Sequence, residues 1–88
     1  RIMTVAQDIE TKLTESFRPA SLKVIDESSQ HAGHMGARPE GETHFRVEIV
    51  ADAFAGKNRV DRQRMIYAVL KDELAGPVHA LSVSANAP

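Results

Sequence analysis

The four histidines are the side chains best suited to metal chemistry in this chain of 88 residues, which contains no cysteine. His31 and His34 lie three residues apart in the segment His31-Ala32-Gly33-His34, and two imidazoles at this spacing can ligate a metal. Gly33 between them argues against a fixed helical geometry. A pair of solvated side chains in a loop is therefore the alternative interpretation.

His79 and His44 fall in segments whose apolar residues alternate. The alternation over residues 78–84 predicts that His79 shares a face with Leu81 and Val83, which we expect to meet helices. A polar ring there must be hydrogen-bonded or lie at the open end of the sheet, because burying it unpaired costs about 1–3 kcal/mol. The residues alone leave open whether His79 is a satisfied edge histidine or a ligand. His44 is interpreted as structural or solvated.

The densest cluster of positive charge spans residues 57–64 and has one anion among its cations, which are Lys57, Arg59, Arg62 and Arg64. Cations at the start of a helix oppose its macrodipole, so helix stability does not explain them. A solvated helix face, an acidic protein surface and phosphate remain alternative explanations. The whole chain has a net charge of −1, so no global field draws it to nucleic acid or to an anionic membrane.

The composition excludes several classes of function. Without cysteine the chain is not a cysteine-nucleophile enzyme, a CxxC redox protein or the sole holder of an iron–sulfur cluster. It has no nucleophile elbow, no glycine-rich phosphate loop and little room for an enclosed pocket. Its uncharged stretches are far shorter than the ~20 residues of a membrane span. We expect an intracellular protein without enzyme activity, small-molecule substrate or membrane partner.

The elements that must position these residues follow from periodicity and from turn residues. In chain order they are a helix over 4–17 that starts with a Thr4–Gln7 capping box, a strand over 22–25, a loop over 28–42, a strand over 43–50, a helical turn over 52–56, a helix over 59–75 capped by Asn58, and a strand over 78–84. Strands and helices with one apolar face each predict an α+β two-layer sandwich, a single domain over residues 1–88.

Seven short motifs, in their order and separations, resemble the BolA family from Ile9 to Pro88. They are Asp26-Glu27-Ser28, His31-Ala32-Gly33-His34, Thr43-His44-Phe45, Phe54-x-Gly56, Arg62-x-Arg64 with Tyr67, Glu73-Leu74 and Val78-His79-Ala80-Leu81. No single motif is specific, but the set is. The resemblance implies an α-β-β-α-α-β order similar to type II KH domains, which agrees with the order expected from periodicity.

The resemblance also implies a function in iron–sulfur trafficking. BolA proteins act as partners of monothiol glutaredoxins, so we expect a monomer that forms a heterodimer around a shared [2Fe–2S] cluster. The family's C-terminal histidine ligand corresponds to His79. The second ligand comes from the loop, where we prefer His31 to His34 because it is nearer the end of the strand and costs less entropy to order. The glutaredoxin and its bound glutathione would supply the thiolates.

A second implication of the resemblance is transcriptional regulation, which some bacterial members perform. The segment 57–64 would then bind nucleic acid, and we expect only weak affinity for DNA. Gln63 stands where the family often has histidine, and the GxxG loop of KH domains keeps only Gly56. A free-standing histidine-metal enzyme is the least supported alternative. We expect the bacterial cytoplasm as the compartment, with the mitochondrial or plastid matrix as the alternative.

Overall fold

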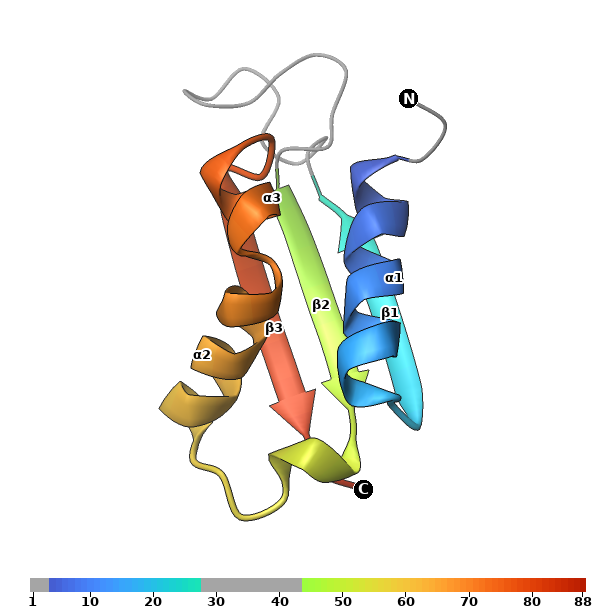
Figure 1. Ribbon diagram of the computed structural model, residues 1–88, viewed down its shortest axis with the longest axis vertical. Helices are drawn as coiled ribbons and strands as arrows, with labels where there is room; N and C mark the ends of the chain where they lie inside the picture. Colours follow the sequence, from blue (N-terminus) through green and yellow to red (C-terminus); the bar gives the residue numbers. More distant parts are fainter. Residues whose placement is uncertain (1–3, 28–43) are drawn as a thin grey trace.

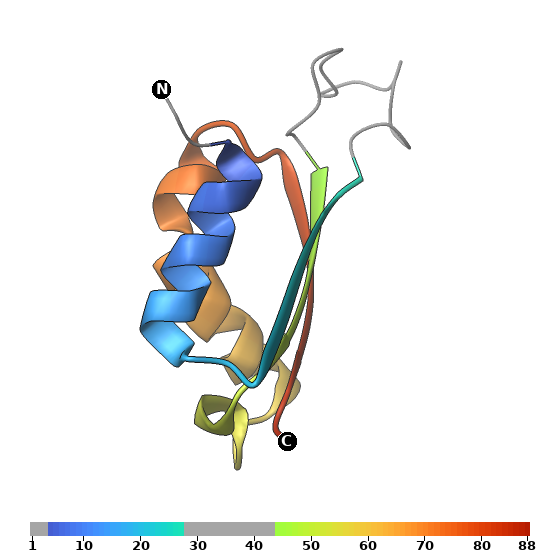
Figure 2. The same ribbon diagram turned by 90° about the vertical axis from the view of Figure 1, so that its right-hand side faces the viewer.

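The computed structural model describes residues 4–27 and 44–88, which form a small sheet with helices packed on one face. The elements are α1 (Val5–Phe17), β1 (Ser21–Asp26), β2 (His44–Val50), the 3-10 turn η2 (Asp52–Phe54), α2 (Arg59–Val69), α3 (Lys71–Ala75) and β3 (Ala80–Asn86). Figure 1 shows the helices in front of the sheet, and Figure 2, turned by 90°, shows that they all lie on one side of it. The predicted α+β two-layer architecture and element order are confirmed. No helix of the described residues is long and apolar enough to cross a membrane.

The sheet has the strand order β1-β2-β3, with β2 in the centre. β1 runs antiparallel to β2, and β3 runs parallel to it. Phe45, Val47 and Ile49 of β2 are buried beneath the helices, while Arg46 and Glu48 point to the open face. The alternation predicted for this strand is therefore confirmed over residues 45–49, because a sheet covered on one side buries every second residue, whereas His44 at the start of the strand is also buried.

α1 begins and ends with the local signals expected from the sequence. Thr4 accepts a hydrogen bond from the Gln7 amide, and the Gln7 side chain accepts one from the Thr4 amide, which completes the capping box. Ile9 and Leu13 are fully buried against the sheet. The helix stops at Arg18, which adopts a left-handed conformation (φ 46°) just before Pro19.

The helix predicted over residues 59–75 is two helices, α2 and α3, separated at Leu70. Asn58 caps α2 as expected, accepting a hydrogen bond from the Asp61 amide at 2.8 Å. Leu70 leaves helical geometry (φ −100°, ψ 18°) and is almost completely buried. Its amide still bonds Ile66 and its carbonyl still bonds Leu74, so the apolar stripe continues across the break. The periodicity of the sequence therefore does not reveal the break at Leu70.

The third strand begins two residues later than predicted, at Ala80 instead of Val78. The Val78 amide donates to the Glu73 carbonyl at 2.9 Å, so Val78 belongs to the turn that follows α3. His79 consequently precedes the strand and is exposed, and the prediction that it faces the helices with Leu81 is wrong. Strand pairing with β2 starts at Ala80, which lies opposite His44.

Candidate functional site

Two histidines meet where β2 and β3 begin. The parallel register places His44 opposite Ala80, directly after His79, and the two imidazole rings lie 5.5 Å apart between centroids at an interplanar angle of 53°. His79 is exposed, whereas His44 is only 8% exposed. The solvated alternative for His44 is therefore wrong. Its proximity to His79 was missed because nothing in the sequence states which strands pair in parallel.

The turn that carries His79 is held by one carbonyl group. Glu73 O accepts hydrogen bonds from the Gly76 amide at 3.2 Å and from the Val78 amide at 2.9 Å. Val78 is 3% exposed, so its side chain anchors the turn in the core. Residues 76–79, called the His79 turn below, thus end in an exposed imidazole on a fixed backbone.

Neutral imidazole nitrogen is a competent ligand for iron and zinc. Rings whose centroids are 5.5 Å apart are close enough for a nitrogen of each to reach one ion at about 2.1 Å. Within residues 4–27 and 44–88, however, no group of three or more His, Cys, Asp or Glu side chains could hold a metal ion. This end of the sheet can contribute a ligand but needs further donors. His31 and His34 lie outside the described residues and stay predictions.

A groove of about 520 Å³ lies at the opposite end of β3, beside the start of α2. We call it the cationic groove; its lining residues are Lys57, Arg59, Arg62, Gln63, Val83, Ser84, Ala85 and Asn86. Three of the four cations predicted to act together are brought together here. Arg64 is exposed but does not line the groove.

Arg62 is the anchor of this groove. Its Nη1 donates to the Ala85 carbonyl at 3.0 Å, which ties α2 to the outer edge of β3. Its Nε is buried and has no hydrogen-bond partner among the described residues. Neither Lys57, Arg59 nor Arg62 forms an ion pair with any described side chain. The groove therefore presents positive charge that the described part of the chain does not neutralise.

Comparison with known proteins assigns the chain to a family. Residues 13–88 match the family model described as BolA-like protein. The chain is 51% identical over 87 residues to the "Uncharacterized protein in cobS 5'region" of Sinorhizobium sp, covering 98% of this chain and 94% of that one. It is 42% identical to the Escherichia coli "DNA-binding transcriptional regulator BolA", covering 92% of this chain and 73% of that one.

The fold comparison agrees. The solved structure of the BolA domain of SufE1 from Arabidopsis thaliana superimposes with a TM-score of 0.88 at 45% identity, covering 100% of this chain and 96% of that one. The chain spans 56% of the length of human BolA-like protein 1, so it corresponds to about half of such relatives. The family match, the relatives and the superposition all point the same way: this chain belongs to the BolA-like protein family.

Proposed function

We propose that the chain is a non-enzymatic adaptor in iron–sulfur trafficking that binds a monothiol glutaredoxin and co-ligates a bridging [2Fe–2S] cluster through His79. The observation that carries this proposal is the exposed imidazole of His79, held on a hydrogen-bonded turn beside His44. The described residues offer too few donors for a site of their own. His79 is ordered and accessible, but it cannot hold a metal by itself. Such a ligand suits a site that a partner protein completes.

The donor chemistry supports a shared cluster as cargo. The chain has no thiolate, so the glutaredoxin and its glutathione would provide the sulfur ligands. Mixed Cys and His ligation of [2Fe–2S] is an established arrangement in which histidine raises the reduction potential. His31, or His34 in its place, would supply a second imidazole from the loop. In this scheme His44 packs against His79 and restricts its ring.

The cationic groove supports a second contact with the same partner. Its unpaired cations would attract an acidic protein surface and orient the docking encounter. Because Val83 to Asn86 line the groove in the second half of β3 and the His79 turn precedes the start of this strand, docking and ligation use different residues and are separable. The compartment we propose is the bacterial cytoplasm, or alternatively the mitochondrial or plastid matrix; relatives include a bacterial protein and one named "Protein BOLA1, chloroplastic".

The adaptor is tested by mixing the chain with a monothiol glutaredoxin, iron, sulfide and glutathione and recording visible absorption and circular dichroism. We expect a 1:1 heterodimer whose spectrum differs from that of the glutaredoxin homodimer. His79→Ala removes this difference, whereas Ser82→Ala, an exposed change on the strand that follows His79, keeps it. An unchanged spectrum in the His79 variant would exclude His79 as a ligand.

A second candidate function, nucleic-acid binding, is favoured by the unpaired cations of the groove and by the E. coli relative, which is named a DNA-binding transcriptional regulator. Outside residues 57–64 the net charge is −4, the total of −1 less the segment's +3, so we expect weak binding to DNA. The three lining cations predict a slope of log K against log salt of about −2.7, at roughly −0.9 per phosphate. A slope near −3.6 would indicate that Arg64 contacts a fourth phosphate. Sub-micromolar, sequence-dependent binding to DNA at ~0.15 M salt that Arg62→Ala abolishes would instead favour transcriptional regulation over the adaptor function.

A further inference from the structure

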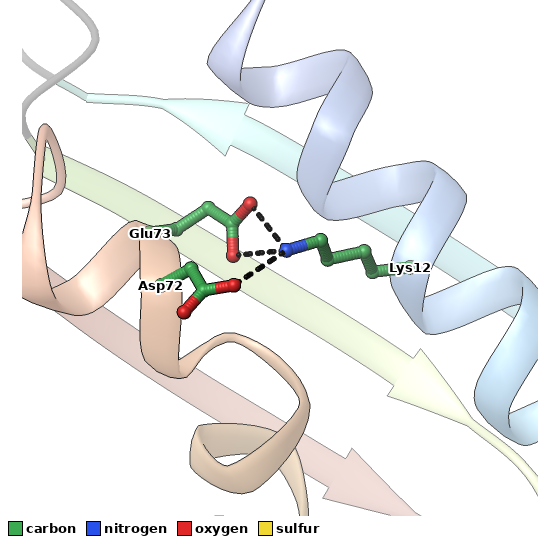
Figure 3. A network of polar contacts seen from close by, with 3 residues as sticks. All are labelled: Lys12, Asp72 and Glu73. Atoms are coloured by element: carbon green, nitrogen blue, oxygen red, sulfur yellow. Dashed lines mark hydrogen bonds and ion pairs between the residues drawn. The ribbon is translucent and has the colours of Figure 1, made fainter.

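One ion pair joins the first helix to the short helix before His79. Glu73 of α3 has a side chain only 10% exposed, and its two carboxylate oxygens lie 2.8 and 3.0 Å from Nζ of Lys12 in α1. Asp72 lies farther from the same nitrogen, at 3.9 Å, and its side chain is 79% exposed (Figure 3). Glu73 therefore makes the closer contact, in a site where a carboxylate needs a partner.

Glu73 also holds the His79 turn through its backbone. Its carbonyl accepts hydrogen bonds from the amides of Gly76 and Val78, and Val78 precedes His79. A single residue thus contacts α1 with its side chain and the His79 turn with its main chain. Any shift of Glu73 moves the acceptor on which that turn depends.

α3 is a short helix whose position depends on apolar packing at Leu74 and on the ion pair with Lys12. It has five residues, begins at the break at Leu70 and has no side-chain cap at its N-terminus. A helix of about one turn is not stable by itself, so its placement depends on tertiary contacts. Leu70 secures its start in the core, and the contact with Lys12 secures its middle.

We infer that Lys12 and Glu73 are positioning residues for His79: their ion pair fixes α3, and through the Glu73 carbonyl it fixes the turn that presents the imidazole. The inference rests on the proposed function for the role of His79 as a ligand. A ligand already ordered before the partner arrives loses less conformational entropy on binding. The ion pair therefore favours formation of the mixed cluster without contacting it.

The experiment uses Lys12→Met, which keeps the aliphatic stem and removes the charge, with Lys12→Arg as the conservative rescue and Asp72→Asn as the control. In the chain alone, hydrogen exchange and nuclear magnetic resonance report on the turn. We expect exchange of the Val78 amide to accelerate in Lys12→Met at least tenfold more than exchange of the Val47 amide in the central strand, which reports the loss of global stability. The cross-relaxation signal between the His44 and His79 rings should weaken in that variant and return in Lys12→Arg.

In the presence of glutaredoxin, Lys12→Met should shorten the lifetime of the mixed cluster about fivefold or more, and Asp72→Asn should leave it unchanged. To separate positioning from lost stability, Lys12→Met is combined with Glu73→Met, which removes the unpaired buried carboxylate. We expect the double variant to regain stability but not the cluster lifetime.

If exchange of the Val78 amide in Lys12→Met accelerates no more than exchange of the Val47 amide, and the ring contact is unchanged, the inference is overturned whether or not a cluster forms. A mixed spectrum lost in His79→Ala but of normal lifetime in Lys12→Met would also overturn it and leave the proposed function intact. Conversely, a cluster spectrum that His79→Ala does not change would refute the proposed function. The inference that the ion pair positions a ligand would then fail too, even if the His79 turn loosened in Lys12→Met.

Discussion

The two ends of β3 differ in whether the charged side chains near them form ion pairs within the chain. Near the His79 turn the nearby ionic groups are paired within the chain: Lys12 binds Glu73, and Arg46 binds Glu27 at 2.7 Å across the first two strands. At the cationic groove, Lys57 and Arg59 find no anionic partner among the described residues. One end pairs its charges within the chain, and the other leaves its charges available to a partner.

This difference predicts separate consequences for variants at the two ends. Changes near the His79 turn should alter the stability of that end and the ligation of the cluster. Changes in the groove should alter association and leave both nearly untouched.

The largest effect on folding is expected from Lys12→Met. It leaves the Glu73 carboxylate unpaired at 10% exposure, which should lower the free energy of unfolding by about 1–3 kcal/mol. Lys57→Met, the same substitution at an unpaired cation, should change it by less than about 0.5 kcal/mol. Urea unfolding followed by circular dichroism measures both. Equal effects would remove the distinction between the two ends.

A tenfold effect on association is expected in the groove. Lys57→Gln combined with Arg59→Gln should weaken binding of the cluster-free chain to glutaredoxin roughly tenfold, because two docking charges are lost. Lys23→Gln combined with Lys71→Gln removes the same charge from exposed positions elsewhere and serves as the control. Isothermal titration calorimetry gives the affinities. If both double variants bind alike, net charge and not the groove attracts the partner.

A smaller effect is expected in the loop, where His31→Ala should shorten the cluster lifetime at fixed pH by a few fold and His34→Ala should change it less. The reason is the lower entropy cost of ordering a residue closer to the end of β1. The decay of the visible absorption of the heterodimer measures the lifetimes. The reverse order would make His34 the ligand.

The smallest effect is expected for His44→Phe, which keeps an aromatic ring beside His79 and removes the imidazole nitrogens. The mixed spectrum should persist, with a lifetime within about twofold of the wild type, because packing against His79 is retained. Visible circular dichroism tests this. Loss as complete as in His79→Ala would make His44 a ligand in its own right.

The sequence predicted those features that are encoded locally. The Thr4–Gln7 capping box, the Asn58 cap and the alternating burial of residues 45–49 in β2 each depend on residues a few positions apart, and each was predicted correctly. The density of cations over residues 57–64 was equally visible.

Features set by distant contacts could not be predicted in this way. The Lys12–Glu73 pair joins residues 61 positions apart, and the His44–His79 contact depends on the parallel pairing of β2 with β3. The late start of β3 has a different origin: it depends on a local hydrogen bond from the Val78 amide to the Glu73 carbonyl, which the alternation of apolar residues does not reveal. The histidines that could bind a metal were therefore identifiable from the sequence, but the residues that contact them were not.

The central claim is that the His79 imidazole binds iron in a cluster shared with the partner. Reducing the heterodimer cluster and recording pulsed electron paramagnetic resonance with ¹⁵N-labelled histidine in this chain alone tests it directly. We expect strong couplings to two directly bound ¹⁵N nuclei in the wild type, one from His79 and one from the loop histidine, and the loss of the His79 coupling in His79→Ala. Identical couplings in the variant, or no ¹⁵N coupling in the wild type, would contradict this claim.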